Sequence, residues 1–173
     1  MKIFLLGYMG SGKSYIGKRL AARNNQKFID FDEEIEKREN LSISEIFEKR
    51  GEVYFRKLER QVLKEMIGLE ADAVISLGGG TPCYGDNMEL IKASDDIFSF
   101  YLKLNIHSLT ERLNAEKEHR PMISHLHEKE KLEEFIRKHL FERGFYYNQS
   151  DRVIDCNDKS VEDIIAEIQA VLG

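Results

Sequence analysis

The sequence of 173 residues has no apolar run that approaches the ~18 residues a membrane span requires. We therefore expect no membrane partner. It has only two cysteines, Cys83 and Cys156, whose spacing fits neither a disulfide framework nor a zinc site. Two free thiols suit a reducing compartment, and the apolar run at residues 3–6 is too short for the core of a signal peptide. From these features we expect a cytoplasmic protein.

The chain also lacks an excess of positive charge. It carries 26 Lys and Arg residues against 31 Asp and Glu residues, which gives a formal net charge of −5. Nucleic-acid binders depend on a broad basic face, so we expect no nucleic-acid partner. The sequence contains no internal repeat and no Ser- or Pro-rich linker. A chain of this length favours one domain with one core, and we expect residues 1–173 to form it.

A complete phosphate-binding loop is present at residues 7–14, which read Gly-Tyr-Met-Gly-Ser-Gly-Lys-Ser. The pattern follows the apolar residues 3–6 and precedes an amphipathic stretch, which is the strand-to-helix context that this motif requires. Glycines allow consecutive N–H groups to point at a polyphosphate, and the helix dipole favours its negative charge. Lys13 would reach the β- and γ-phosphates, and Ser14 would bind Mg²⁺. The loop therefore predicts a nucleoside triphosphate site.

Short apolar segments alternate with helical patterns along the chain. The expected strands are residues 2–6, 27–30, 73–77, 97–102 and 152–155. Helical spacing of apolar residues is found in residues 14–24, 55–69, 132–140 and 161–172. This alternation predicts an α/β fold in which helices cover both faces of a five-stranded parallel sheet. Ligands of such sheets bind at the carboxyl ends of the strands.

Acidic residues and glycines follow the second and third expected strands. Asp30 and Asp32 would face the same side if the strand continued through them, and a carboxylate there could orient an acceptor hydroxyl and take its proton. Either residue could instead cap the helix that begins near Glu33. The three glycines at 78–80 would admit an anion or a ring, or would form a plain turn. Because residues 76–77 include no Asp, the metal-side carboxylate must come from Asp30 or Asp32.

Four arginines are candidates for anion binding, because a guanidinium forms a bidentate fork with a carboxylate or phosphate. They are Arg56, Arg112, Arg120 and Arg143. Each one taken alone would more often be an exposed surface charge. Arg120 lies in the most polar segment, residues 114–131, which we interpret as a mobile surface loop. In a phosphoryl-transfer enzyme this is where a lid is expected.

Taken in order, these segments resemble the shikimate kinase family along essentially the whole chain. The matching segments are 7–14, 28–32, Phe55-Arg56 with Glu59, 78–80, 120–122, and Arg143 with Tyr147. The phosphate loop alone belongs to a large superfamily, whereas the ordered set includes residues of the substrate side. The resemblance implies a three-layer α/β/α fold of the P-loop kinase type. It also implies a substrate-binding region at about residues 31–60 and a mobile lid at about residues 114–126.

The implied activity is the ATP-dependent phosphorylation of the 3-hydroxyl of shikimate. On the substrate side, Asp32 would hold the ring hydroxyls and act as, or orient, the base. Arg56, positioned by Glu59, and Arg143 would grip the shikimate carboxylate. Backbone groups would contact the ring and its hydroxyls at Gly78, Gly79 and Gly80.

On the nucleotide side, the resemblance implies that Lys13 and Arg120 join Asp32 as catalytic residues. Ser14 would bind Mg²⁺, and Asp30 would do so through water. The residues expected to contact ATP are Gly10, Ser11, Gly12, Lys13, Ser14, Tyr15, Arg112, Arg120 and Asn157. The partners implied are ATP and shikimate, and we expect a monomer.

Two other kinds of function remain compatible with the phosphate loop. A gluconate or nucleotide kinase on the same scaffold would explain the loop and the lid, but not paired arginines that fit a carboxylate. The alternative outside the enzymes is a nucleotide-dependent switch or binding protein. Guanine-specific switches carry the run Asn-Lys-x-Asp, which the segment 157–159 does not match.

Overall fold

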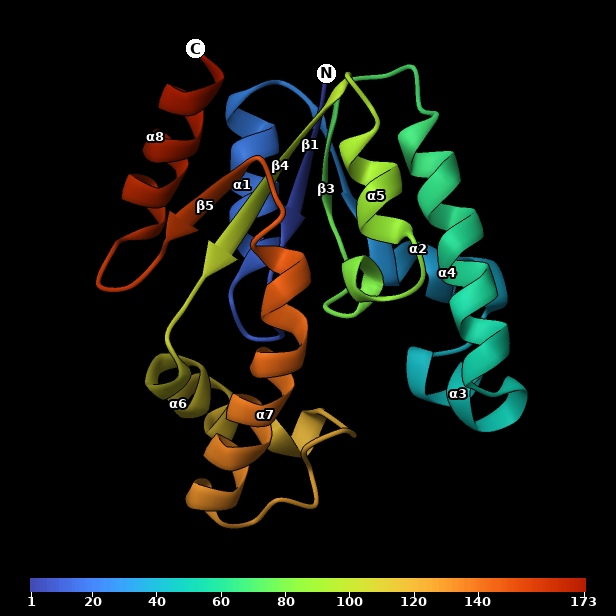
Figure 1. The fold of residues 1–173 in the computed structure, drawn as a ribbon, viewed down its shortest axis with the longest axis vertical. Helices are drawn as coiled ribbons and strands as arrows, with labels where there is room; N and C mark the ends of the chain where they lie inside the picture. Colours follow the sequence, from blue (N-terminus) through green and yellow to red (C-terminus); the bar gives the residue numbers. More distant parts are fainter.

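The computed structural model describes all residues, 1–173, and its centre is a parallel sheet of five strands (Figure 1). The strands are β1 (Lys2–Leu6), β2 (Lys27–Asp30), β3 (Ala73–Ser76), β4 (Ile97–Lys103) and β5 (Arg152–Asp155). Their order across the sheet is β2-β3-β1-β4-β5, and every neighbouring pair is parallel. The predicted five-stranded parallel sheet is confirmed, and the predicted strand bounds agree to within one residue at each end.

Helices cover both faces of this sheet and complete a three-layer α/β/α fold. They are α1 (Lys13–Arg23), α2 (Phe31–Glu39), α3 (Ile43–Arg50), α4 (Glu52–Ile67), α5 (Asn87–Lys92), α6 (Ile106–Glu116), α7 (Lys129–Tyr147) and α8 (Val161–Leu172). Helix α1 packs on β1, β2 and β3 and contacts α8, whereas α5 packs on β4 with α4 beside it. In Figure 1, α3 and the α6–α7 pair project beyond the edge at which the strands end.

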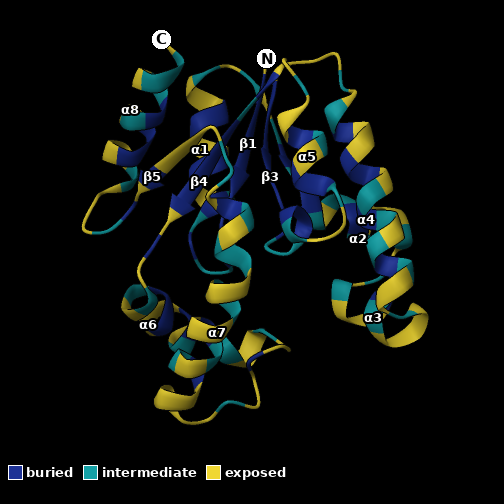
Figure 2. Ribbon diagram, viewed as in Figure 1, coloured by how far each residue is buried: buried dark blue, intermediate teal, exposed yellow.

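The core lies between these layers, where Figure 2 shows the strands mostly buried. Residues 3–6 of β1 are all 0% exposed. A central strand that is covered on both faces reads as a continuous apolar run, which is why β1 shows no polar alternation. None of the helices combines the length and the apolarity that a membrane crossing needs.

The structure corrects the interpretation of the segment after β2. The strand ends at Asp30 and α2 begins at Phe31, so the strand does not continue through Asp32. The reason is helix capping, because Asp30 Oδ1 accepts a hydrogen bond from the backbone N–H of Glu33 at 3.1 Å. The capping alternative is therefore confirmed for Asp30, and Asp32 lies in the first turn of α2.

The polar segment at 114–131 is also more ordered in its backbone than a simple loop. Helix α6 extends to Glu116, a 3₁₀ turn follows at Lys117–His119, and α7 begins at Lys129. Ile123 in the middle of the segment is 0% exposed and joins the core. One buried apolar side chain therefore anchors this polar segment to the body of the protein.

Candidate active site

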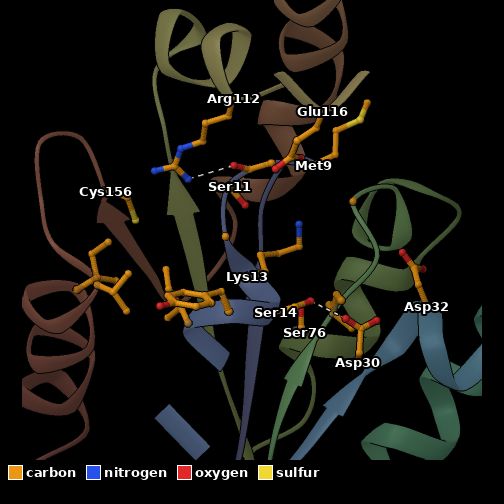
Figure 3. A pocket seen from close by; sticks show the side chains of 18 of the residues that line it. Met9, Ser11, Lys13, Ser14, Asp30, Asp32, Ser76, Arg112, Glu116 and Cys156 are labelled. Carbon is orange, nitrogen blue, oxygen red and sulfur yellow. Dashed lines mark hydrogen bonds between the residues drawn. The ribbon is translucent and has the colours of Figure 1, made fainter. Parts of the chain in front are cut away.

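A cleft of about 480 Å³ lies where the strands end. Its walls come from the phosphate loop, from the segments that follow β2, β3 and β5, and from α6 (Figure 3). The predicted site residues that line it are Gly10, Ser11, Gly12, Lys13, Ser14, Tyr15, Asp30, Asp32, Gly79, Arg112 and Arg120. The structure thus brings together residues from four separate stretches of the sequence.

The phosphate loop takes a backbone shape that requires glycine at two of its positions. Gly10 and Gly12 have φ values of 79° and 92°, which side-chain-bearing residues rarely adopt. The buried Lys13 ammonium lies inside this loop and donates to the backbone oxygens of Gly7 at 2.7 Å and Tyr8 at 3.1 Å. Burial lowers the pKa of Lys13 to about 8, although the nearby Asp32 opposes this shift. The loop therefore holds the Lys13 ammonium by hydrogen bonds to its own carbonyl groups.

Three oxygen-bearing side chains lie at the floor of the cleft. Ser14 Oγ donates to Asp30 Oδ2 at 2.5 Å and lies 3.2 Å from Ser76 Oγ (Figure 3). Hydroxyl and carboxylate oxygens are ligands that Mg²⁺ prefers, and this ion usually takes one or two protein ligands plus waters and substrate phosphates. No cluster of three His, Cys, Asp or Glu side chains is present that could form an all-protein cage. The residues therefore fit Mg²⁺ bound together with a polyphosphate.

The Asp32 carboxylate lies beside the run of three glycines. A Cβ placed on Gly78 would stand only 2.6 Å from Asp32 Oδ1. Burial, reinforced by the negative charge of Asp30, raises the pKa of Asp32 to about 6, while the charge of Lys13 opposes the rise. A carboxylate with a pKa near neutrality suits a general base that works at neutral pH.

Arg56 is held by contacts on several sides. Its Nη1 donates to Glu59 Oε1 at 2.9 Å, and Glu59, only 2% exposed, also accepts from Thr81 Oγ1 at 2.9 Å. The guanidinium carbon lies 3.4 Å from the ring centroid of Tyr84, a stacked arrangement. The buried Arg56 Nε has no hydrogen-bond partner. Arg56 therefore keeps donor capacity for an anion.

The guanidinium of Arg143, from α7, meets that of Arg56 at the same glycine. A Cβ placed on Gly80 would stand 3.1 Å from Arg56 Nη1 and 3.2 Å from Arg143 Nη2. A Cβ on Gly79 would stand 3.2 Å from Arg143 Nη1 and 3.7 Å from the backbone oxygen of Gly7. The paired arginines, the glycine run and the phosphate loop are therefore neighbours in space.

The other two arginines reach the cleft from the α6 side. Arg112 Nη1 donates to the backbone oxygen of Gly10 at 3.1 Å, a bond drawn in Figure 3. Arg120 donates to Glu116 Oε2 from Nη2 at 2.9 Å and from Nε at 3.2 Å. Both side chains line the cleft, and each is held by a neighbour on the protein. A phosphate could compete with either neighbour, because a guanidinium binds phosphate strongly.

Asn157 is the one predicted nucleotide contact that does not line the cleft. Its side-chain oxygen accepts from the backbone N–H of Asn105 at 2.9 Å, and its amide donates to Asp155 at 2.8 Å. The cleft wall in this part of the chain is formed instead by Cys156 and Lys159. The amide of Asn157 therefore connects the ends of β4 and β5.

A family model described as "Shikimate kinase" matches residues 9–173. The chain belongs to the shikimate kinase family. Two relatives that bear the name "Shikimate kinase" agree. That of Flavobacterium johnsoniae is 47% identical over 172 residues, which is 99% of each chain. That of Flavobacterium psychrophilum is 46% identical over 171 residues, covering 99% of this chain and 98% of the relative.

Solved structures of shikimate kinases have the same fold. The enzyme from Bacteroides thetaiotaomicron is 36% identical with a TM-score of 0.90, covering 99% of this chain and 98% of the other. The enzyme from Acinetobacter baumannii in complex with shikimate is 31% identical with a TM-score of 0.87, covering 99% and 92%. A deoxyadenosine kinase from M. mycoides, 19% identical with a TM-score of 0.61 and covering 99% and 98%, shares the fold alone. The predicted family, kinase class and P-loop kinase fold are confirmed.

In this member of the shikimate kinase family, several residues of the site were not predicted from the sequence, among them Ser76, Tyr84 and Glu116. Ser76 lies next to the Ser14 hydroxyl, Tyr84 stacks on Arg56, and Glu116 pairs with Arg120. Glu116 was open to detection, because an acidic residue four positions before an Arg commonly pairs with it on a helix. Neither of the other two contacts has a local pattern that would have revealed it.

Proposed function

We propose that this chain transfers the γ-phosphoryl group of ATP to the 3-hydroxyl of shikimate, giving shikimate 3-phosphate and ADP. The observation that carries the proposal is the convergence of Arg56 and Arg143 on Gly80, beside Asp32 and the phosphate loop. Shikimate is a small acid with several ring hydroxyls, so it requires a carboxylate-binding group and a hydroxyl-binding group within one ring diameter. The paired guanidiniums and the Asp32 carboxylate supply these two chemistries.

On the substrate side, Arg56 and Arg143 hold the carboxylate, and Gly78, Gly79 and Gly80 contact the ring through their backbone. Asp32 accepts the proton of the 3-hydroxyl as its oxygen bonds to the γ-phosphorus, and the bond from that phosphorus to the bridging oxygen of ADP breaks. This division matches phosphoryl transfer in general, which depends on positioning and charge neutralisation.

On the nucleotide side, Lys13 leaves the carbonyls of its own loop for the β- and γ-phosphates. Ser14 and Asp30 would hold Mg²⁺, Asp30 through water, and the ion would supply positive charge to the phosphate oxygens. Arg120 releases Glu116 and binds the transferred phosphoryl group. The surrounding contacts to ATP come from Gly10, Ser11, Gly12, Tyr15 and Arg112, which line the cleft, whereas Asn157 does not.

The segment at about residues 114–126 acts as a lid in this proposal. It carries Arg120, and its neighbour Arg112 already contacts the phosphate loop at Gly10. Closure of the segment over ATP would exclude water from the transferred group, which phosphoryl-transfer enzymes need in order to avoid ATP hydrolysis. The region at about residues 31–60, which includes Asp32 and Arg56, forms the substrate side.

We also propose that the protein acts as a cytoplasmic monomer and binds no nucleic acid or membrane. The acidic net charge of −5 and the two unpaired cysteines support this setting. Light scattering after size exclusion should give a mass near 20.2 kDa. A mass twice as large would contradict the monomer.

Measurement of ADP release from ATP and Mg²⁺, with and without shikimate, tests the main proposal. Release should depend on shikimate, and phosphorus NMR should show a monoester on the 3-hydroxyl. Gluconate and nucleoside monophosphates, tested in parallel, should give no release above background. Release that is equal with and without shikimate, or greater with gluconate or a nucleotide, would overturn it.

A further inference from the structure

Helix α7 presents three polar side chains at four-residue steps, His139, Arg143 and Tyr147. Residues at this spacing lie on one face of a helix, one turn above the other. The face is turned toward the site, because Arg143 lies next to Gly79 and Gly80. The residues one turn before and one turn after Arg143 therefore decide how that guanidinium is presented.

Both flanking side chains are hydrogen bonded to loops of the site. The hydroxyl of Tyr147, which is 0% exposed, donates to the backbone oxygen of Gly79 at 2.6 Å. On the other side, the hydroxyl of Tyr8 lies 2.8 Å from His139 Nδ1. Tyr8 is the second residue of the phosphate loop. One turn after Arg143, helix α7 is thus hydrogen bonded to the glycine run. One turn before Arg143, it is hydrogen bonded to the phosphate loop.

The Tyr8–His139 contact has the features of a specific bond. Tyr8 is 1% exposed, and its ring meets the imidazole edge to face, with centroids 5.3 Å apart and planes at 89°. The ring of Phe135 also contacts the imidazole, with ring centroids 5.3 Å apart. The guanidinium carbon of Arg143 lies 5.9 Å from the Tyr8 ring centroid. A buried hydroxyl that bonds to a confined imidazole fixes the positions of both rings.

Burial, together with the positive charge of Arg143, keeps the imidazole of His139 neutral, and burial keeps the hydroxyl of Tyr8 protonated. Burial and the charge of Arg143 lower the pKa of His139 to about 4, and burial raises the pKa of Tyr8 above its ordinary value. The hydrogen bond between Tyr8 and His139 therefore joins two neutral side chains near pH 7. Among His139, Arg143 and Tyr147, Arg143 is therefore the only cation, so no neighbouring positive charge on this face of α7 competes with it for a carboxylate.

We propose that Tyr8 and His139 form a positioning pair that holds α7, and with it the Arg143 guanidinium, in register with the phosphate loop. This inference rests on the proposed function, because it concerns the affinity for the carboxylate that Arg143 binds. Neither residue lines the cleft, so the pair acts through the position of Arg143. It couples the two halves of the site, since Tyr8 belongs to the loop for ATP and His139 to the helix for the acid.

Kinetics of four variants test this inference. Tyr8→Phe removes only the hydroxyl, and His139→Leu removes its imidazole partner at similar volume, so each should raise KM for shikimate about three- to tenfold. The kcat and the KM for ATP should stay within about twofold. His139→Asn retains an oxygen near the position of Nδ1 and should restore KM to within about twofold of the wild type. Tyr146→Phe, on the same helix, is the matched control, because its hydroxyl makes no hydrogen bond, and it should leave all constants unchanged.

The double variant Tyr8→Phe/His139→Leu distinguishes a coupled pair from two independent residues. Its KM for shikimate should equal that of the more impaired single variant, because the shared bond can be lost only once. The inference would be overturned if the two single-variant effects on KM for shikimate multiplied in the double variant. It would also be overturned if Tyr8→Phe left KM unchanged, or if His139→Asn failed to restore it. An unaltered KM for ATP shows that the loop is folded, so Tyr8→Phe decides the question even if His139→Leu unfolds. Wild-type protein inactive with shikimate would instead overturn the proposed function.

Discussion

Glu59 Oε1 accepts a hydrogen bond from Arg56 Nη1 at 2.9 Å, and Glu59 is almost completely buried beneath that guanidinium. The two residues are one turn apart on α4, and Thr81 donates to the other oxygen of the same carboxylate. A buried charged side chain that is hydrogen bonded through both oxygens fixes the position of its partner. Removal of that partner destabilises the protein, because the buried charge is left unpaired. Glu59 therefore acts on substrate affinity through Arg56.

Replacement of Glu59 should separate this positioning from stability. Glu59→Gln keeps an acceptor but loses the charge, so KM for shikimate should rise severalfold while kcat falls less. Glu59→Ala leaves buried donors without a partner and should also lower the free energy of unfolding by about 1–3 kcal/mol. Shikimate saturation kinetics and urea unfolding measure the two effects. Glu52→Gln is the control, because Glu52 is 3.8 Å from Arg56 Nε and 60% exposed, and unchanged kinetics are expected.

Gly80→Ala offers a steric test of the paired arginines. Gly80 has φ −88° and ψ −14°, which alanine adopts freely, so the added methyl acts through space alone. It would stand 3.1 Å from Arg56 Nη1 and 3.2 Å from Arg143 Nη2 and should push both guanidiniums away. We expect KM for shikimate to rise about tenfold or more, with KM for ATP nearly constant.

The control for this test is Gly68→Ala, at the end of α4, where φ is −79° and the added methyl would meet nothing closer than 3.4 Å. It should leave the kinetics unchanged. A Gly80→Ala enzyme with wild-type KM for shikimate would show that the acid does not bind between the two arginines. Calorimetric titration with shikimate alone would give the same answer without turnover.

Asp32→Asn should abolish activity and stabilise the fold. Burial raises the pKa of Asp32 to about 6, so the folded protein binds this proton more tightly than the unfolded chain does. The ionised carboxylate therefore costs stability above pH 6, and this cost disappears below about pH 4, where both states are protonated. Near pH 7.5, the free energy of unfolding of Asp32→Asn should exceed that of the wild type by about 1–2 kcal/mol. This gain should shrink as the pH falls from 6 to 4.

The same pKa predicts the acid limb of the activity. In the wild type, kcat/KM should fall about tenfold per pH unit below about pH 6, because the protonated Asp32 cannot take the proton of the substrate hydroxyl. Rates from pH 5 to 8 test the activity, and chemical unfolding from pH 4 to 8 tests the stability. A flat profile down to pH 5 would remove Asp32 as the base.

How much of this site was predictable depends on the distance in sequence between the residues involved. The phosphate loop could be predicted because its shape is local, with glycines at the positions of positive φ. The helix after β2 carried a local signal too, an Asp at 30 with a Glu three residues later, which is typical of a helix start. The same residues were also compatible with a strand that continued to Asp32, but in the structure Asp30 caps α2 and the strand ends there.

Contacts between distant residues could not be found in this way. Tyr8 and His139 are 131 residues apart, and only the packing of α7 against the phosphate loop brings them together. The stacking of Arg56 on Tyr84 likewise depends on the turn that follows the three glycines. Helices α3 and α5, of 8 and 6 residues, were not predicted, because so few turns show little periodicity. The family resemblance supplied roles for the arginines, and the structure supplied their partners.

Arg120→Ala should lower kcat far more than it weakens ATP binding. In the structure Arg120 is held by Glu116, so its contact to a phosphoryl group exchanges one anion for another and adds little to ground-state affinity. In the transition state it would neutralise developing charge, and an arginine in this role contributes about 10³–10⁵ in rate in GTPases. We expect a loss of about 10²-fold or more in kcat with KM for ATP within severalfold.

Two further variants show that the effect belongs to Arg120. Arg112→Ala should chiefly raise KM for ATP, because Arg112 contacts the phosphate loop at Gly10 and is assigned to nucleotide binding. Arg137→Ala, at an arginine that is 62% exposed on α7 and paired with Glu133, should behave as the wild type. Single-turnover measurements at saturating ATP isolate the chemical step from product release. An Arg120→Ala enzyme with an undiminished single-turnover rate would mean that the transferred phosphoryl group is neutralised by Lys13 and Mg²⁺ without the lid arginine.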